Sequence, residues 1–235
     1  MKGTWCAGLL SVMVAATATP MAVQAELAGC DLPKVDDFVL FVDQSGSMYQ
    51  NHAEIGEVKE ILAKRTLLEL NQEVPEKFCC LESALYLFAP YEEVKVPYVY
   101  DRDSLATRIG WIPDSQPVSL RLTPMADGFE ELTPVVSGIK GKTAVIMVSD
   151  GGANTGGDPV EAARALVAAK PGTCLHVVSV ADSDSGREVN KALAAITPEC
   201  RSVEARDILG NASKMQQFAR DVFCKSLPPT PRRGG

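Results

Sequence analysis

The sequence has few of the residues that zinc sites and nucleic-acid-binding surfaces require. It contains two histidines, His52 and His176, and no Cys-x-x-Cys pair or Cys/His cluster with zinc-site spacing. Lysine and arginine number 23 against 30 aspartate and glutamate residues, so no basic excess is available to neutralise phosphates. These shortages exclude a zinc-finger fold and argue against a nucleic-acid partner. We expect His176 to be buried in a strand and His52 to lie on the surface.

One long apolar run stands near the start of the chain. Lys2 is followed by an almost uncharged stretch over 9–23 and then by small residues, a pattern typical of a cleaved secretory signal. Pro20 argues against a stable membrane-spanning helix. We therefore predict a signal peptide over 1–25 and an exported chain, periplasmic or at the cell surface. Loss of Lys2 changes the charge of the mature chain to 22 − 30 = −8.

Six cysteines remain after that cleavage, an even number that indicates disulfides in an exported chain. Leu27-Ala28-Gly29-Cys30 also has the order of a lipobox, in which Cys30 would be acylated. Glu26 interrupts the apolar segment, and acylation would leave an odd five cysteines, so we favour release; lipidation of Cys30 stays as the one route to a membrane. The six candidates are Cys30, Cys79, Cys80, Cys174, Cys200 and Cys224.

Apolar runs of strand length alternate with stretches of helical period, which predicts an α/β fold with a doubly wound, mostly parallel sheet. Ile55, Val58, Ile61, Leu62 and Leu68 indicate the inner face of a long first helix. Strands are expected at 38–42, 81–88, 94–99, 143–149, 175–180 and 202–205, and Pro97 places the third strand at an edge.

The predicted domain spans 36–226. A lead-in precedes it at 26–35, and a disordered Pro/Gly/Arg tail follows at 227–235. Asp158 before Pro159 predicts a helix start. Asn211 begins a glycosylation sequon, but a helix cap is the better interpretation of that asparagine.

Oxygen-bearing side chains follow the expected strands. Asp43, Ser45 and Ser47 come where the first strand ends, Thr123 precedes a helix, and Asp150 follows the strand at 143–149. Ligands of open parallel sheets bind at the carboxyl ends of the strands. Two carboxylates and three hydroxyls form a hard oxygen site that favours magnesium, with manganese or calcium as alternatives. Such residues also commonly cap helices, so one loop alone would indicate capping.

Three segments resemble, in order and spacing, the metal-ion-dependent adhesion site of von Willebrand factor type A domains, here of an exported bacterial type. They are 41–48 (FVDQSGSM), 122–125 (LTPM) and 148–152 (VSDGG). The resemblance implies a six-stranded sheet in the order 3-2-1-4-5-6, with an antiparallel third strand at one edge and helices on both faces. It also implies that all five oxygen-bearing residues hold the metal, whose open position takes an acidic residue of a protein partner.

The same resemblance implies that the cysteines gather at the face opposite the metal. Among the 15 connectivities of six cysteines, it suggests Cys30 with Cys224 and Cys174 with Cys200. Movement of the last helix can switch affinity in this family, and a disulfide at Cys224 would restrict that movement.

The resulting hypothesis is a metal-dependent adhesion or envelope-assembly module rather than an enzyme. One alternative is a metal-independent structural part of an envelope complex. Another is a magnesium-dependent phosphohydrolase with Asp43 as nucleophile, although Ser45 replaces its usual second acid and no lysine of obvious catalytic spacing follows. No Gly-x-Ser-x-Gly elbow indicates a serine hydrolase.

Overall fold

The computed structural model describes residues 27, 30–78, 81–90, 92–93, 99–115 and 122–225. This part of the chain contains six strands and eight helical segments. The strands are β1 (Asp37–Asp43), β2 (Glu82–Phe88), β3 (Glu92–Glu93), β4 (Thr143–Ser149), β5 (Cys174–Ser179) and β6 (Ser202–Glu204). The helices are α1 (Lys59–Glu73), α2 (Arg102–Trp111), α3 (Met125–Gly138), α4 (Pro159–Ala169), α5 (Asp184–Ala194), α6 (Ala205–Ile208) and α7 (Ala212–Phe223), and η1 (Gly46–Tyr49) is a 3₁₀ turn.

The strands form one sheet in the order β3-β2-β1-β4-β5-β6. Five strands run parallel, and the two-residue β3 pairs antiparallel with β2. Every residue of β1 and β4 is buried, as expected for strands covered on both faces. The α/β class and the strand order agree with the sequence-based expectation.

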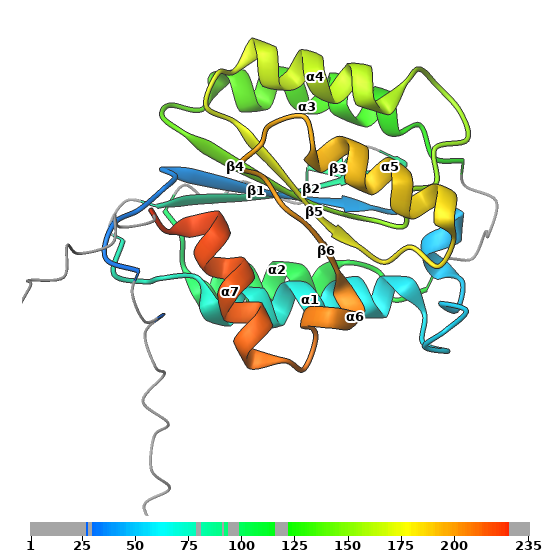
Figure 1. The fold of residues 1–235 in the computed structure, drawn as a ribbon, viewed down its shortest axis with the longest axis horizontal. Helices are drawn as coiled ribbons and strands as arrows, with labels where there is room; N and C mark the ends of the chain where they lie inside the picture. Colours follow the sequence, from blue (N-terminus) through cyan, green and yellow to red (C-terminus); the bar gives the residue numbers. More distant parts are fainter. Residues whose placement is uncertain are drawn as a thin grey trace, which may run out of the picture.

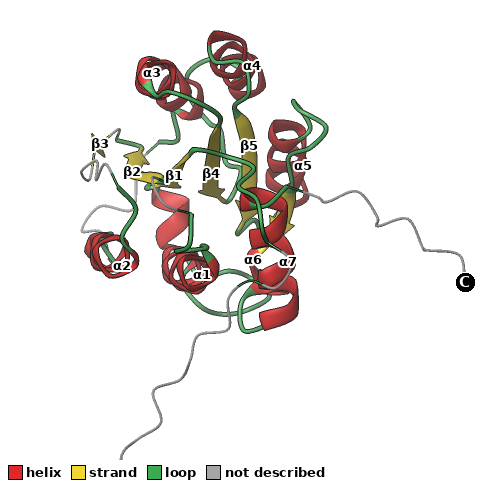
Figure 2. Ribbon diagram, turned by 90° about the vertical axis from the view of Figure 1, so that its left-hand side faces the viewer, coloured by secondary structure: helices red, strands yellow, loops and turns green. Residues whose placement is uncertain are grey.

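Helices cover both faces of the sheet (Figure 1). Alternate residues of β1 point to opposite faces: Leu40 belongs to the core under α1, α2 and α7, whereas Phe41 packs against Phe129 of α3 in the other core. The end-on view shows the same two layers, with α3 and α4 on one side of the sheet and α1 and α2 on the other (Figure 2). Among the described residues, no helix combines the length and the apolar character needed to cross a membrane.

Helix boundaries follow local capping. Asp158 accepts hydrogen bonds from the first backbone N–H groups of α4, with Pro159 at the first helical position. Asn211 caps α7 by accepting from the N–H of Lys214 at 3.2 Å. Both predicted caps are confirmed.

The third strand expected at 94–99 falls mostly outside the described residues, because only Val99 of this range is described and it is not in a strand. The described third strand, at 92–93, pairs antiparallel with β2 at the edge of the sheet. The expected start of the first helix is wrong. The first helix begins at Lys59, and Ile55 lies before it with 40% of its surface exposed.

Two disulfides lie at the amino ends of the strands. Cys30 and Cys224 are bonded with their Cα atoms 5.2 Å apart, and Cys174 and Cys200 with theirs 5.6 Å apart. Both suggested pairs are confirmed, and disulfides are typical of an oxidising compartment outside the cytoplasm. The Cys30 sulfur cannot be both in this bond and acylated, so the disulfide argues against the lipid anchor.

Several predicted features lie outside the described residues. These are Cys79 and Cys80, the signal peptide over 1–25 and the tail over 227–235. The described end of the lead-in pairs with the end of α7 through an antiparallel bridge between Pro33 and Cys224.

Candidate metal centre

The first loop of the site folds back on the last residue of β1. Asp43 is fully buried, and its Oδ1 accepts a hydrogen bond of 2.8 Å from the backbone N–H of Ser45. The chain then enters η1, and the Oγ atoms of Ser45 and Ser47 lie 3.2 Å apart. The carboxylate and both hydroxyls of this loop therefore belong to one compact turn.

The third loop follows β4 and bends at a glycine. Gly151 has φ +74°, and a Cβ there would overlap the backbone oxygen of Gly186, so this position requires glycine. After the bend, Asp150 Oδ1 accepts a hydrogen bond of 3.0 Å from the N–H of Gly152. This bond orients the carboxylate over its own loop.

Side chains from three loops meet beside Gly152. A Cβ at this position would lie 3.1 Å from Asp150 Oδ1, 3.6 Å from Ser47 Oγ and 3.9 Å from Thr123 Oγ1. The N–H of Thr123 donates to Asn154 Oδ1 at 2.8 Å, which ties the second loop to the third. We call this space, bounded by the three oxygens and left open by a residue without a side chain, the oxygen cradle.

Ser149 connects the first loop to the third. Its Oγ donates to Asp43 Oδ2 at 2.7 Å and accepts from the N–H of Gly151 at 2.9 Å. Hydrogen bonds therefore link Asp43 and the two serines of the first loop to one another and, through Ser149, to the third loop. Thr123 and Asp150 join this set as neighbours of Ser47 around Gly152. Sequence reasoning missed Ser149, although it directly precedes Asp150.

The two acids of the site, Asp43 and Asp150, affect each other's ionisation. Burial, and then the negative charge of Asp150, raise the pKa of Asp43 to about 7, although the hydrogen bonds from Ser149 and Ser45 act in the opposite direction. Two neighbouring carboxylates disfavour ionisation of one another. A cation bound between them would favour the ionised form of both.

Lys59 is the residue of this site that sequence reasoning missed most clearly. It is the first residue of α1, and its Nζ lies 3.0 Å from Asp150 Oδ2 and 2.8 Å from Asp182 Oδ1. Burial opposes its charge, but the hydrogen bond to Asp182 and the charge of Asp150 outweigh burial and raise the pKa of Lys59. The sequence predicted a longer first helix with Lys59 inside it, and a lysine within a helix usually faces solvent.

A buried polar network supports the first loop from below. Gln44 Nε2 donates to the carbonyl oxygen of Asp43 at 3.1 Å and to Glu60 Oε1 at 2.9 Å, and the Tyr49 hydroxyl donates to Gln44 Oε1 at 2.6 Å. Burial raises the pKa of Glu60 to about 8. Glu60 is therefore mostly protonated at neutral pH and adds little negative charge to the site.

Neither histidine contacts the predicted ligands. His176 is buried in β5 as expected; its Nδ1 accepts from the N–H of Arg201, and burial lowers its pKa to about 3. The expectation for His52 is wrong, because this residue is only 2% exposed and its Nδ1 accepts from the N–H of Glu54 at 3.2 Å.

The donors fit a hard divalent cation. In the part of the chain that the structure describes, no three His, Cys, Asp or Glu side chains form a metal-binding group. The predicted set has only two carboxylates, so its remaining donors would be hydroxyls and water, which suit magnesium or manganese. The oxygen cradle and the paired acids are the structural features that favour such an ion.

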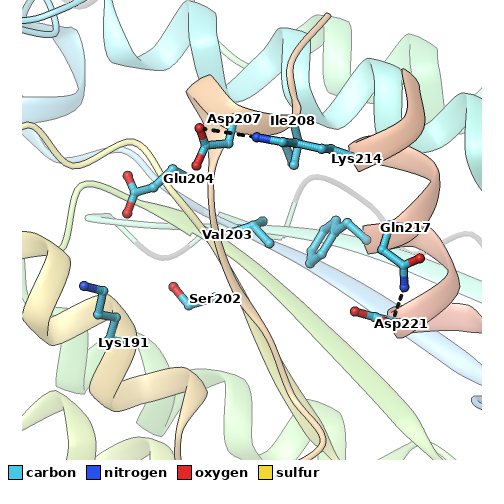
Figure 3. A pocket seen from close by; sticks show the side chains of 10 residues that line it. Lys191, Ser202, Val203, Glu204, Asp207, Ile208, Lys214, Gln217 and Asp221 are labelled. Atoms are coloured by element: carbon cyan, nitrogen blue, oxygen red, sulfur yellow. Dashed lines mark hydrogen bonds and ion pairs between the residues drawn. The ribbon is translucent and has the colours of Figure 1, made fainter. Parts of the chain in front are cut away.

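A pocket of about 360 Å³ lies elsewhere, between α5, β6, α6 and α7 (Figure 3). None of the five predicted ligands lines it. Among its lining residues, Lys214 pairs with Asp207 at 3.8 Å, and Asp221 accepts a hydrogen bond of 3.0 Å from Gln217. The pocket is therefore separate from the oxygen cradle.

Neither a protein-family model nor a curated protein sequence matches this chain. Solved structures do match its fold. An aerotolerance-related membrane protein from Bacteroides fragilis has 15% identity and a TM-score of 0.60, over 79% of this chain and 98% of that one. The manganese-loaded TRAP protein of Plasmodium vivax has 16% identity and a TM-score of 0.53, over 77% of this chain and 72% of that one.

A third similar structure is the vWF domain of the type V pili tip protein Mfa5 from Porphyromonas gingivalis. It has 10% identity and a TM-score of 0.56, over 82% of this chain and 97% of that one. At these identities the likeness establishes the fold, which is the α/β fold of von Willebrand factor type A domains. It does not establish that these proteins share ligands.

Proposed function

We propose that this protein is an exported binding module that holds one divalent cation at Asp43, Ser45, Ser47, Thr123 and Asp150. The observation that carries the proposal is the oxygen cradle beside Gly152, to which three separate loops contribute. Magnesium is the expected ion, and manganese and calcium are alternatives. The manganese-loaded TRAP structure has the same fold, which supports this choice.

The bound ion would supply a positive charge with an open coordination position, suited to a carboxylate of a protein partner. The residues of the chain prepare that position. Ser45 and Ser149 hold the buried Asp43 carboxylate by hydrogen bonds, and Gly152 holds that of Asp150. The occurrence of the fold in a pilus tip protein supports a role in adhesion or envelope assembly.

Binding rather than catalysis is the better proposal for this site. Within the described residues, neither His52 nor His176 hydrogen-bonds a site serine, so the usual base of a hydroxyl nucleophile is not beside it. The structure does place Lys59 beside Asp150, which sequence reasoning had not foreseen for a phosphohydrolase. Its pairing with both Asp150 and Asp182 commits the ammonium to structural contacts.

The test is calorimetric titration of the mature protein with Mn²⁺ and Mg²⁺. The native chain should bind one ion, Asp43→Ala should lose at least about a hundredfold in affinity, equivalent to about 2.7 kcal/mol, and the fold should persist by circular dichroism. Asp184→Ala is the matched control, because Asp184 begins α5 at the same edge of the sheet and its side chain is 97% exposed. Equal affinities of the native chain and Asp43→Ala would contradict the proposal.

A second measurement addresses the open position. Acetate is the simplest carboxylate probe, and it should displace water from protein-bound Mn²⁺, which lowers the water-proton relaxation rate. An unchanged rate at saturating acetate would show that the bound ion does not take up a carboxylate. That result would favour the metal-independent assembly role.

A further inference from the structure

The two oxygens of the Asp150 carboxylate have different partners. Oδ1 accepts from the N–H of Gly152 and borders the oxygen cradle, whereas Oδ2 lies 3.0 Å from the buried ammonium of Lys59. The side chains of Lys59 and Asp150 are each only 5% exposed. Water therefore screens this pair little, and one carboxylate oxygen is committed to the lysine.

Lys59 is itself held in place by a second acid. Asp182, in the loop between β5 and α5, contacts Lys59 Nζ through Oδ1 at 2.8 Å and accepts from the N–H of Ala53 through Oδ2 at 3.0 Å. The ammonium is thus fixed between Asp182 and Asp150. It cannot leave Asp150 Oδ2 without also breaking or rearranging the contact with Asp182.

We propose that Lys59 is a positioning residue that restricts Asp150 to one metal-facing oxygen and thereby selects magnesium and manganese over calcium; this inference rests on the proposed metal-binding function. Calcium takes six to eight oxygens and commonly uses both oxygens of a carboxylate. Magnesium requires a compact octahedral shell in which each carboxylate gives one oxygen. With Oδ2 held by Lys59, Asp150 can give an ion one oxygen, as magnesium requires, but not the two oxygens that calcium commonly uses.

The charge of Lys59 has a separate effect. A buried ammonium beside a metal-binding carboxylate repels a divalent ion, so it lowers the affinity for every such ion. Removing the ammonium should strengthen the binding of all three ions. Calcium should gain most, because it alone also gains a second oxygen from Asp150. The change in the ratio of Mg²⁺ to Ca²⁺ affinity therefore measures the positioning role of Lys59. The change in affinity that all three ions share measures the effect of its charge.

The experiment is calorimetric titration of the mature chain with Mg²⁺, Mn²⁺ and Ca²⁺. The native protein should bind Mg²⁺ and Mn²⁺ at least about tenfold more tightly than Ca²⁺, a difference of about 1.4 kcal/mol. Lys59→Met should strengthen Ca²⁺ binding most and reduce the ratio to about threefold or less. Arg65→Met is the matched control, because it removes a half-exposed cation from the same helix and should leave the ratio unchanged.

Asp182→Asn separates the two contacts of the lysine. It removes the charge of Asp182 but leaves Lys59 paired with Asp150, so the preference for Mg²⁺ over Ca²⁺ should persist. Loss of the preference in Asp182→Asn, or its retention in folded Lys59→Met, would overturn the role of Lys59. If Lys59→Met does not fold, the native chain still decides, because Ca²⁺ binding as tight as that of Mg²⁺ refutes the inference.

The two proposals fail in different ways. If the native chain binds none of the three ions, the proposed function fails, and the role of Lys59 fails with it. If the native chain binds ions and Asp43→Ala does not, but Lys59→Met keeps the native ratio, only the role of Lys59 fails.

Discussion

β1 begins and ends with a buried aspartate, and the two residues have opposite surroundings. Burial, together with the nearby Glu82 and Asp36, raises the pKa of Asp37 to about 6, and its Oδ2 has no hydrogen-bond partner among the described residues. Both oxygens of Asp43 accept hydrogen bonds. A raised pKa is common to both residues, so it does not distinguish the proposed metal site. The hydrogen bonds that hold both carboxylate oxygens of Asp43 do distinguish it from Asp37.

The same contrast holds for the two edges of the sheet. At the amino ends of the strands, two disulfides close the structure covalently, and a hydrogen-bonded β-bridge joins Pro33 to Cys224. At the carboxyl ends, hydrogen bonds and one buried lysine hold three loops and two neighbouring acids. Covalent bonds therefore hold one edge, whereas within the described residues the edge of the proposed metal site depends on non-covalent contacts alone.

The largest expected effect is on stability, and it comes from removing the disulfides at the amino edge. Replacing Cys30 and Cys224 by alanine releases a loop of 194 residues and should lower the free energy of unfolding by up to about 5 kcal/mol. Replacing Cys174 and Cys200 releases 26 residues and should lower it by about 3 to 4 kcal/mol. Urea denaturation measures both, and metal affinity should stay within about threefold of the native value. A tenfold loss of metal affinity in either folded double variant would show that the two edges are coupled.

A smaller change at the carboxyl edge should affect the metal alone. Gly152→Ala places a methyl group in the oxygen cradle, so Mn²⁺ affinity should fall about tenfold while stability changes little. Gly157→Ala is the matched control in the same loop, because its Cβ would meet only Ala126 at an ordinary 3.6 Å. Calorimetric titration compares the two variants. Equal affinities would show that the space beside Gly152 is not where the ion binds.

The smallest expected effect concerns Asp37 at the amino edge. Its pKa of about 6 in the folded chain exceeds the ordinary 3.8, so the folded state binds the proton more tightly and this residue costs stability as pH rises from about 4 through 6. Asp37→Asn should remove that cost and be more stable by about 1 kcal/mol at pH 7. Thermal unfolding between pH 4 and 8 measures the difference, which should grow with pH; a constant difference would contradict the assignment to Asp37.

The sequence predicted the features that depend on local pattern. β4 lies at its predicted bounds, because a continuous apolar run defines the strand, and α4 begins where the Asp158 cap and Pro159 predict it. The oxygen-bearing residues were found because each directly follows a strand or precedes a helix. The pairing of the cysteines came from the family resemblance, since spacing alone does not select it.

The sequence could not predict contacts between distant loops. Lys59 lies 91 residues before Asp150, and nothing around it distinguishes a buried lysine from a solvated one at the start of a helix. The oxygen cradle also depends on how three loops meet, so Gly152 could be recognised as part of a bend but not as the residue that leaves the space open. His52 was misplaced for the same reason, because tertiary packing buries it.

The Cys30–Cys224 bond has a mechanical consequence. Tension applied between the chain before Cys30 and the chain after Cys224 would pass through the sulfur bridge and bypass the sheet. The 193 residues between the two cysteines would then bear no load from such a pull. A force exerted by a bound partner at the opposite edge would instead run lengthwise along the parallel strands, the direction in which many hydrogen bonds share the shear.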